Sequence, residues 1–381
     1  LVRGEAELMF PEGTEWKVQV REKGRLDRLE GVPVVREPLR RGYVRVSVRA
    51  AGLNFRDVLN ALGMVPIPWL GLELSGVIDE VGVGVEHLKV GDRVFGLGEA
   101  AFASDAVADA RYLTRIPEGM SFEDAAATPL AFLTAWYALH DLGSLQPNER
   151  VLIHAAAGGV GMAAVQVARL RGAEVFGTAS EAKWDVLRGM GFAEERIASS
   201  RSLEFAERFE GGVDVVLNAL AGEFIDASLS LLGEGARFLE MGKTDQRDAT
   251  WFERHHPRVG YFAFDLLDAE PERIQSMLVH LAGLFAEGSL QPLPMRAFPM
   301  GRVSHVFRWM AQARHIGKLV LVPRHFERAR AVGEQLQMLG QAYCLRSELN
   351  KPTEADCLVV DSTGELMSFY ETATVVFVGK S

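Results

Sequence analysis

The chain has 381 residues, a formal net charge of −10 and 48% hydrophobic residues. This length predicts two or three domains with sizeable cores. The acidic balance, without a basic stripe, argues against a nucleic-acid-binding protein, and no apolar run approaches the roughly 20 residues of a membrane helix. The cysteines, Cys344 and Cys357, argue against a disulfide framework and favour a reducing cytoplasm. Because the chain opens on Leu1 and stops at Ser381, we expect a piece of a longer polypeptide.

The first third of the chain has a β-rich pattern. Residues 17–118 contain short alternating segments such as 43–48, separated by turn signals such as Gly91-Asp92. We therefore expect a β-rich domain over residues 1–120.

From Ser121 the pattern changes to helices that alternate with short apolar strands. The expected strands are 150–154, 174–178, 213–217 and 236–240. This alternation predicts a doubly wound parallel sheet of the Rossmann type over residues 121–267. An amphipathic helix pattern follows at 271–290, and a strand-like stretch at 316–322.

The strongest chemical signal is a run of small residues between a strand and a helix. Residues 151–161 read Val-Leu-Ile-His-Ala-Ala-Ala-Gly-Gly-Val-Gly, and a helix is expected over 162–171. Small residues let the backbone approach a pyrophosphate, and the helix N-terminus offers it free N–H groups. The pattern predicts dinucleotide binding by Ala155, Gly158, Gly159, Val160 and Gly161. An ordinary glycine-rich turn is the alternative, which leaves the small residues unexplained.

The residues after the next strand predict NADPH as the cofactor. An NAD site usually places a carboxylate at the end of this strand, to hold the ribose 2′-hydroxyl. Here Ser180 and Lys183 follow the strand, and Arg201 comes later as a second cation for a 2′-phosphate. Glu181 argues the other way unless it points outward, and Lys183 has the alternative of being an ordinary solvated lysine.

Six motifs in order carry a family resemblance. They are residues 50–57 (Ala-Ala-Gly-Leu-Asn-Phe-Arg-Asp), 71–76 (Gly-Leu-Glu-Leu-Ser-Gly), the small-residue run, 213–218 (Val-Asp-Val-Val-Leu-Asn), 238–245 (Phe-Leu-Glu-Met-Gly-Lys-Thr-Asp) and 311–318 (Ala-Gln-Ala-Arg-His-Ile-Gly-Lys). Over residues 17–318 the chain resembles the medium-chain dehydrogenase/reductase superfamily. Within it, the chain resembles the enoyl reductase domains of modular polyketide synthases and animal-type fatty acid synthases.

The resemblance implies a GroES-like β-rich catalytic domain, made of residues 1–120 and 268–318 and joined to the Rossmann domain. It also implies a reaction. In that reaction NADPH gives hydride to Cβ of a trans-2-enoyl thioester on an acyl carrier protein, and the enolate is protonated at Cα. By resemblance Lys243 and Asp265 are the proton-donor pair, although a structural salt bridge is the alternative. Neighbouring synthase domains are the implied protein partners.

Other site residues follow from the same resemblance. Asn54, Arg56 and Asp57 organise the loop near the nicotinamide, with a local Arg56–Asp57 ion pair as the alternative. Asn218 and Gly242 contact the cofactor. Some relatives have tyrosine at the position of Phe55, where its hydroxyl is linked to protonation of one face of the enolate. For an α-branched substrate, Phe55 therefore predicts the opposite stereochemical outcome.

No metal site is expected. Glu73 belongs to Gly-Leu-Glu, where zinc-dependent alcohol dehydrogenases of this layout carry Gly-His-Glu. No cysteine precedes Cys344, and the histidines show no His-x-x-His spacing. Activation of the substrate is therefore expected to come from hydrogen bonds and from the position of the cofactor.

Residues 319–381 form a truncated α/β fragment in this interpretation. A helix over 326–339, a strand over 357–361, a helix over 363–373 and a strand over 375–378 are expected. The segment resembles part of the C-terminal half of lipid A Kdo transferases without their acceptor domain, so no transferase activity is expected, even from Glu365. A fusion of two unrelated genes is our hypothesis, and a divergent C-terminal extension is the alternative.

Three rival functions remain open at this point. One is a free-standing quinone or enoyl-CoA reductase. Another is a non-catalytic NADPH-binding structural module. A sugar-nucleotide enzyme is the third and rests on the C-terminal segment alone.

Overall fold

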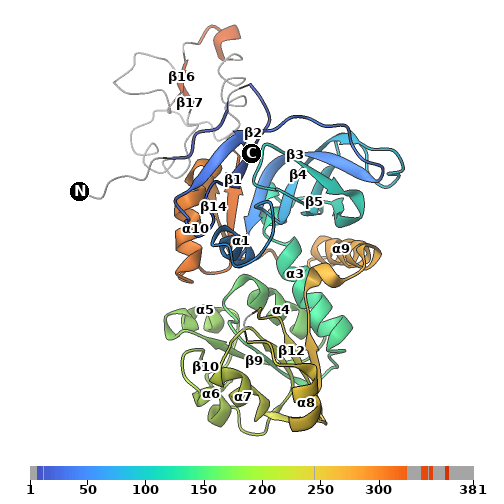
Figure 1. Cartoon of the computed structure of the whole chain (residues 1–381), viewed down its shortest axis with the longest axis vertical. Helices are drawn as coiled ribbons and strands as arrows, with labels where there is room; N and C mark the ends of the chain where they lie inside the picture. Colours follow the sequence, from blue (N-terminus) through green and yellow to red (C-terminus); the bar gives the residue numbers. More distant parts are fainter. Residues whose placement is uncertain are drawn as a thin grey trace, which may run out of the picture.

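The computed structural model describes residues 7–11, 13–243, 245–323, 336–341, 343–345 and 357–359. It has two lobes (Figure 1), a β-rich domain and an α/β domain. Helices α3 (Pro129–Trp136) and α9 (Pro271–Ala286) lie between the two lobes. The expected combination of a β-rich domain and a domain with a parallel sheet is confirmed.

The β-rich domain is built on a seven-stranded sheet. Its strands run in the order β14 (Met295–Pro299), β15 (Lys318–Val322), β3 (Tyr43–Leu53), β4 (Glu73–Val81), β5 (Arg93–Leu97) and β7 (Leu113–Arg115), and β6 (Asp105–Asp109) also pairs with β3. The alternation predicted for residues 43–48 buries Val44, Val46 and Val48 completely. A two-stranded sheet, β1 (Trp16–Val20) and β2 (Leu29–Pro33), and helices α1 (Phe55–Ala61), α2 (Phe122–Ala126) and α10 (Val303–Ala311) complete the domain.

The α/β domain is a six-stranded sheet in which every neighbouring pair is parallel. Its order is β10 (Ile197–Ser199), β9 (Glu174–Ala179), β8 (Arg150–Ile153), β11 (Val213–Asn218), β12 (Leu232–Glu240) and β13 (Gly260–Ala263). Separate apolar clusters form on its two faces, as a doubly wound sheet requires. Its helices are α4 (Gly159–Leu170), α5 (Trp184–Gly189), α6 (Glu204–Arg208), α7 (Glu223–Leu229) and α8 (Ala249–His255).

Several short helical turns connect these elements. A π-helix, η2 (Tyr137–Leu142), continues α3. The 3₁₀ turns are η1 (Ala110–Tyr112), η3 (Glu181–Lys183), η4 (Glu194–Arg196), η5 (Leu266–Asp268) and η6 (Met300–Arg302). Of these, η2 and η5 flank the edge of the parallel sheet beside the site described below.

Two domain boundaries differ from those expected. The boundary at residue 318 is wrong, because β15 continues to Val322 and pairs with both β14 and β3. Helix α2, expected in the Rossmann domain from residue 121, packs against β3 and β4 of the β-rich domain. Helix α9, expected in the β-rich domain, packs against η1 and β7 of that domain, and its buried face, which includes Leu278, also joins the apolar cluster of the Rossmann domain. Local periodicity does not reveal which neighbour a helix packs against.

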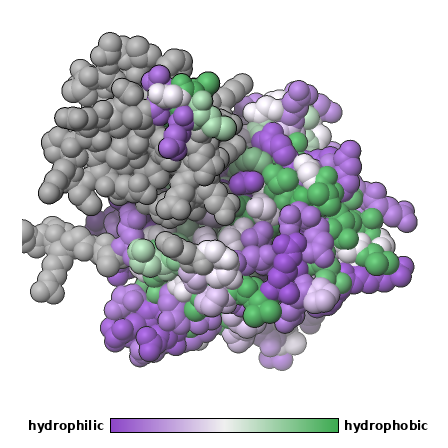
Figure 2. Space-filling model, turned by 90° about the horizontal axis from the view of Figure 1, so that it is seen from above, coloured by the Kyte–Doolittle hydropathy of each residue, from purple (hydrophilic) through white to green (hydrophobic). Residues whose placement is uncertain are grey.

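The surface mixes polar and apolar groups. Figure 2 shows hydrophobic residues broken up by hydrophilic ones on the described part of the face seen from above. Exposed hydrophobic side chains of the β-rich domain include Val35, Val83 and Val90. Among the described residues, no helix combines the length and the apolar character needed to cross a membrane.

The C-terminal segment is described only in part. Residues 336–338 are helical, within the helix expected over 326–339. Strand β17 (Cys357–Val359) falls within the expected strand 357–361 and pairs in parallel with β16 (Tyr343–Leu345). Glu365, the helix expected over 363–373 and the strand expected over 375–378 lie outside the described residues, and the Kdo transferase resemblance and the gene fusion stay hypotheses.

Candidate active site

The small-residue run forms a tight connection between β8 and α4. Ala155 adopts a left-handed backbone conformation, with φ of 51°, and Gly158 is the N-cap of α4. A Cβ atom on Gly161 would lie 2.4 Å from the Ala155 carbonyl oxygen and 2.7 Å from the Ala156 Cα atom. The turn is therefore as tight as a dinucleotide loop requires, and the first N–H groups of α4 have no carbonyl partner within the helix.

The β-rich domain closes over this loop from the other side. Gly317 forms an isolated parallel bridge with Gly158. A Cβ atom on Gly159 would lie 2.8 Å from the Cδ atom of Lys318. Val160 is half-buried in the first turn of α4. The loop thus lies directly at the junction of the two domains.

The residues predicted for a 2′-phosphate lie together after β9. Ser180 follows the strand as the N-cap of η3, and Lys183 donates hydrogen bonds to the carbonyl oxygens of Ala313 and His315 at 2.8 and 2.6 Å. Lys183 is therefore half-buried rather than an ordinary solvated lysine. Burial and the neighbouring charge of Arg201 lower the pKa of Lys183. Arg201 is exposed beside it, so two cations converge on this corner.

Asn218 and Gly242 meet around the carboxyl group of Glu240. The Asn218 side chain donates to one Glu240 oxygen at 2.7 Å, and the Gly242 N–H donates to the other at 2.6 Å. Burial raises the pKa of Glu240 to about 7. This buried group fixes the ends of β11 and β12, where the loops of a parallel sheet face a ligand.

Lys243 and Asp265 form the ion pair expected of them. Lys243 Nζ lies 3.1 Å from an Asp265 carboxylate oxygen and donates to the Phe264 carbonyl at 2.9 Å. Arg56 Nη1 donates to both Asp265 oxygens, at 3.0 and 2.8 Å. The alternative of a local Arg56–Asp57 ion pair is therefore wrong, because Arg56 pairs with Asp265 of the Rossmann domain.

Helix α1 presents Phe55 and Arg56 from a firmly held first turn. The buried Asp57 carboxylate accepts from the backbone N–H groups of Asn54 and Gly71, at 3.0 and 2.8 Å. Phe55, the first residue of the helix, leaves 53% of its surface exposed. An exposed phenylalanine beside an ion pair is available for contact with a ligand.

A buried network that was not predicted holds Asn54. Lys318 Nζ lies 2.5 Å from a Glu73 oxygen and 2.6 Å from the Asn54 side-chain oxygen. Asn54 also donates to Glu73 at 2.8 Å, and the second Glu73 oxygen accepts from the Leu130 N–H. Both charged side chains are almost completely buried. The motifs containing Glu73 and Lys318 were visible in the sequence, but their pairing joins β4 to β15 across 245 residues.

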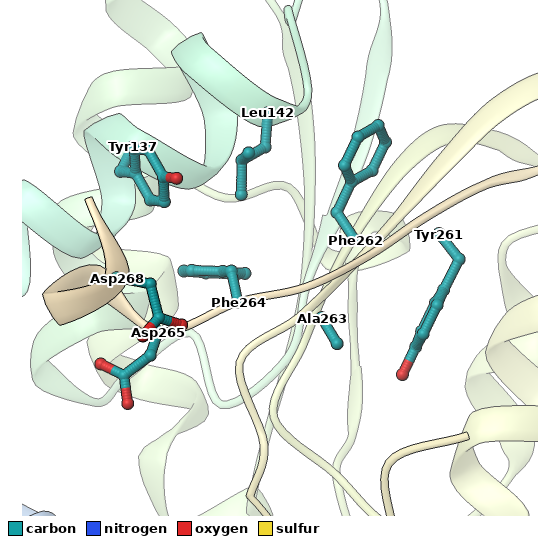
Figure 3. Close-up of a pocket in the computed structure, with 8 residues that line it drawn as sticks. All are labelled: Tyr137, Leu142, Tyr261, Phe262, Ala263, Phe264, Asp265 and Asp268. Atoms are coloured by element: carbon teal, nitrogen blue, oxygen red, sulfur yellow. The ribbon is translucent and has the colours of Figure 1, made fainter. Parts of the chain in front are cut away.

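A cavity of about 360 Å³ adjoins Asp265 (Figure 3). In Figure 3, Asp265 and Asp268 lie at one end of it and Tyr261 at the other. Aromatic and aliphatic side chains from β13, η2 and the segment after β13 line the space between them: Tyr137, Leu142, Phe262, Ala263 and Phe264. Apolar surface therefore extends up to the carboxylate.

Two family models match the chain. An alcohol dehydrogenase GroES-like domain matches residues 40–118, and a zinc-binding dehydrogenase model matches residues 193–321. Polyketide synthase GfsB of Streptomyces halstedii is 54% identical over 309 residues, which make up 80% of this chain and 6% of GfsB. The pikromycin polyketide synthase component PikAII of Streptomyces venezuelae is 53% identical over 317 residues, 80% of this chain and 8% of PikAII. The chain thus spans less than a tenth of the length of either relative.

Among solved structures, CurK enoyl reductase is 40% identical, with a TM-score of 0.78, covering 81% of this chain and 99% of the CurK chain. The chain belongs to the enoyl reductases of the medium-chain dehydrogenase/reductase superfamily. The apo JamJ enoyl reductase is 33% identical, with a TM-score of 0.78, over 82% of this reductase and 100% of that chain. Escherichia coli quinone oxidoreductase complexed with NADPH is 25% identical, with a TM-score of 0.73, over 81% of this reductase and 100% of that chain.

The residues of this reductase do not fit a zinc ion, although one matching family model describes zinc-binding dehydrogenases. Within the described ranges, no group of three His, Cys, Asp or Glu side chains is arranged to hold a metal. Glu73 already has the Lys318 ammonium beside it, so a cation occupies the position next to this carboxylate. No step of the reaction is therefore assigned to a metal.

Proposed function

We propose that this reductase uses NADPH to saturate the Cα–Cβ double bond of a trans-2-enoyl thioester carried on an acyl carrier protein. The Lys243–Asp265 pair carries this proposal, because it lies at the carboxyl ends of β12 and β13, the same edge of the parallel sheet at which the dinucleotide loop leaves β8. Its ammonium group is the proton donor that the reaction needs. The similarity to CurK and JamJ enoyl reductases supports the reaction class.

The residues present fit a dinucleotide. The first turn of α4, closed by Gly158 and Gly161, would hold the pyrophosphate with backbone N–H groups. Asn218 and Gly242 would border the nicotinamide end, where Glu240 fixes both. The bound cofactor supplies hydride, and every other task falls to the protein.

Lys183 and Arg201 support NADPH over NADH. Two neighbouring cations and the Ser180 hydroxyl form a corner suited to the 2′-phosphate of NADPH. Position 180 holds a serine instead of a carboxylate that could bind the 2′-hydroxyl of NADH. The E. coli quinone oxidoreductase, whose structure holds NADPH, shares the fold.

Lys243 would hold the proton that reaches Cα. Its ammonium is fixed by the Asp265 carboxylate and the Phe264 carbonyl, which together use two of its three N–H donors. The third N–H remains for the substrate, either to stabilise charge on the thioester oxygen or to pass a proton to the enolate. Phe55, exposed on α1, would line the approach to the double bond without offering a proton.

The carrier protein and the neighbouring synthase domains are the partners that we propose. The curated relatives are polyketide synthases many times longer than the matched region. A thioester that arrives on a carrier protein would keep the reaction within one assembly of domains. The low cysteine content favours the cytoplasm as the compartment of this reductase.

The full chain should be mixed with crotonyl pantetheine thioester and NADPH. Oxidation of the cofactor is then measured as the loss of its absorbance. NADH replaces NADPH in one arm, and a benzoquinone replaces the thioester in another. Turnover of the thioester with NADPH, faster than with NADH or with the quinone, is expected. Turnover of the quinone alone would establish the rival quinone reductase, and cofactor binding without any turnover would establish a binding module.

A further inference from the structure

Arg56 connects the two domains at the proposed proton donor. It stands in the first turn of α1, in the β-rich domain, whereas Asp265 follows β13 of the Rossmann domain. Its Nη1 atom donates to both carboxylate oxygens, at 3.0 and 2.8 Å. The two side chains are 29% and 18% exposed, so solvent screens this pair only in part.

Both ends of this contact are held in place by other bonds. On the Arg56 side, Asp57 caps the helix and bonds Gly71, while Asn54 is held by the buried Lys318–Glu73 pair. On the other side, Asp265 is the N-cap of η5 and accepts from the Leu267 N–H. The contact therefore joins two rigid points, and it holds only while the domains keep their relative position.

Lys243 depends on the same carboxylate. It approaches one Asp265 oxygen at 3.1 Å, while Arg56 bridges both oxygens. Its second anchor, the Phe264 carbonyl, belongs to the adjacent residue of the same segment. Any change that turns or neutralises the Asp265 carboxylate therefore moves the Lys243 ammonium.

The charges around Asp265 keep it ionised. Burial pushes the pKa of Asp265 upward, but the Leu267 N–H and the charges of Arg56 and Lys243 outweigh burial, and the pKa lies below its ordinary value. Asp268 of η5 and Tyr137 of η2 line the same cavity and add no positive charge. Arg56 is thus one of two cations that face this carboxylate among the described residues.

We propose that Arg56 is a positioning residue of the reduction: it fixes the Asp265 carboxylate across the domain junction and thereby places the Lys243 ammonium for proton delivery. This proposal rests on the proposed function, because it assigns Arg56 a part in that reaction. It also assigns the motif of residues 50–57 a role in the reaction, since Arg56 of this motif bonds Asp265, 209 residues further along the chain.

Three variants of the full chain test this proposal. Arg56→Gln removes the charge and keeps much of the length of the side chain. Arg56→Lys keeps the charge but replaces the planar guanidinium group by an ammonium group. Arg258→Gln breaks an exposed ion pair with Glu234 and is the matched control. Two readouts are needed: the pH profile of kcat with crotonyl thioester and NADPH, and the titration of Asp265 by NMR of ¹³C-labelled aspartate, assigned with Asp265→Asn.

In Arg56→Gln, kcat should fall roughly 10-fold or more at neutral pH, since small misplacements of a catalytic group are costly. The acid limb of kcat should move up by roughly one pH unit, together with the titration of Asp265. The KM for NADPH should stay within a factor of about two, because Arg56 lies outside the phosphate loop. Arg56→Lys should restore part of both effects, and Arg258→Gln should match the wild type.

An Arg56→Gln enzyme with an unchanged acid limb and an unchanged Asp265 titration would overturn the role of Arg56 while the proposed function stands. A loss of kcat without either shift would indicate a merely structural residue and would also overturn it. A wild type that reduces no enoyl thioester would instead overturn the proposed function. The NMR titration would still show whether Arg56 fixes Asp265, so the two failures are distinguishable.

Discussion

Among single residues, Phe55 is exposed at the start of α1 and directly precedes Arg56. Its side chain brings no hydroxyl group to the site. Phe55→Tyr adds a phenol that can hold a proton beside the substrate. With an α-methyl enoyl thioester, we expect the variant to shift the product towards the opposite α-configuration. Chiral chromatography of the released acid measures the ratio, and an unchanged ratio with full activity would contradict the assignment of this position.

Arg201 is the exposed cation at the proposed 2′-phosphate corner. Arg201→Ala should raise the KM for NADPH roughly 10-fold and leave the KM for NADH unchanged, because a charge-assisted bond to the phosphate is lost. Arg254→Ala, a substitution in α8 away from this corner, is the matched control. Equal effects of Arg201→Ala on both cofactors would argue against a phosphate contact.

Single residues also show what sequence reasoning reached and what it missed. Lys243 and Asp265 were predicted together, and they lie 3.1 Å apart, because each follows a strand of the same parallel sheet. The bonds from Arg56 to Asp265 and from Lys318 to Glu73 were missed, because each joins segments more than 200 residues apart in the chain. No periodicity in one segment specifies such a partner. The catalytic and cofactor roles themselves stay predictions.

At the scale of elements, the connection from β8 to α4 is the feature most tightly determined by its sequence. Gly161→Ala would place a Cβ atom 2.4 Å from the Ala155 carbonyl oxygen. The turn must then shift, so we expect a loss of about 1–3 kcal/mol in unfolding free energy and weaker NADPH binding. Gly189→Ala, whose Cβ would meet nothing within 4 Å, should lower neither the stability nor the affinity for NADPH. Urea unfolding and fluorescence titration with NADPH measure both, and equal behaviour of the two variants would refute this account of the loop.

His154 ties three elements together inside the Rossmann domain. Its ring bonds Thr178 of β9 and Ser228 of α7, at 2.9 and 2.8 Å, from the end of β8. Burial lowers the pKa of His154 to about 3 from 6.5. Below pH 6.5 the unfolded chain therefore takes up a proton that the folded chain refuses, and stability is lost as the pH falls from 6.5 towards 3.

A comparison with His154→Gln isolates this effect from other titrating groups. The variant is expected to be less stable than the wild type at neutral pH, because a buried hydrogen-bonding network is disturbed. Between about pH 6.5 and about pH 5 the difference in unfolding free energy should shrink by at most about 2 kcal/mol. Urea titrations at both pH values measure it, and a constant difference would mean that the pKa of His154 is not depressed.

The elements themselves were largely predictable. The strands expected at 150–154, 174–178, 213–217 and 236–240 all exist, and the helix expected over 162–171 begins three residues earlier, at Gly159. The start of this helix was not predicted, because the small residues at its N-terminus form a sequence pattern that is also typical of loops. The π-helix η2 was not predicted, because its register depends on packing against α9 and the sheet rather than on its own pattern.

In the whole molecule, the two domains meet at the β8–α4 loop, at the Arg56–Asp265 ion pair and at the buried network of Lys318 and Glu73. In the sheet of the β-rich domain, β15 lies between β14 and β3, and it leads from Gly317 at the phosphate loop into the core. The expected break at residue 318 fell inside this strand, because an apolar run serves equally well as the end of one domain or the start of another. Spatial pairing decides between these possibilities, and local sequence does not.

In the proposed reaction, Lys243 delivers the proton in an NADPH-dependent enoyl reduction. The most direct test is kcat with crotonyl pantetheine thioester and NADPH for the wild type, Lys243→Ala and the exposed-lysine control Lys89→Ala. We predict that Lys243→Ala lowers kcat roughly 10²- to 10⁴-fold, as expected for the loss of a general acid, while it still binds NADPH and Lys89→Ala keeps wild-type turnover. A Lys243→Ala enzyme with the kcat of the wild type would show that Lys243 is not the proton donor.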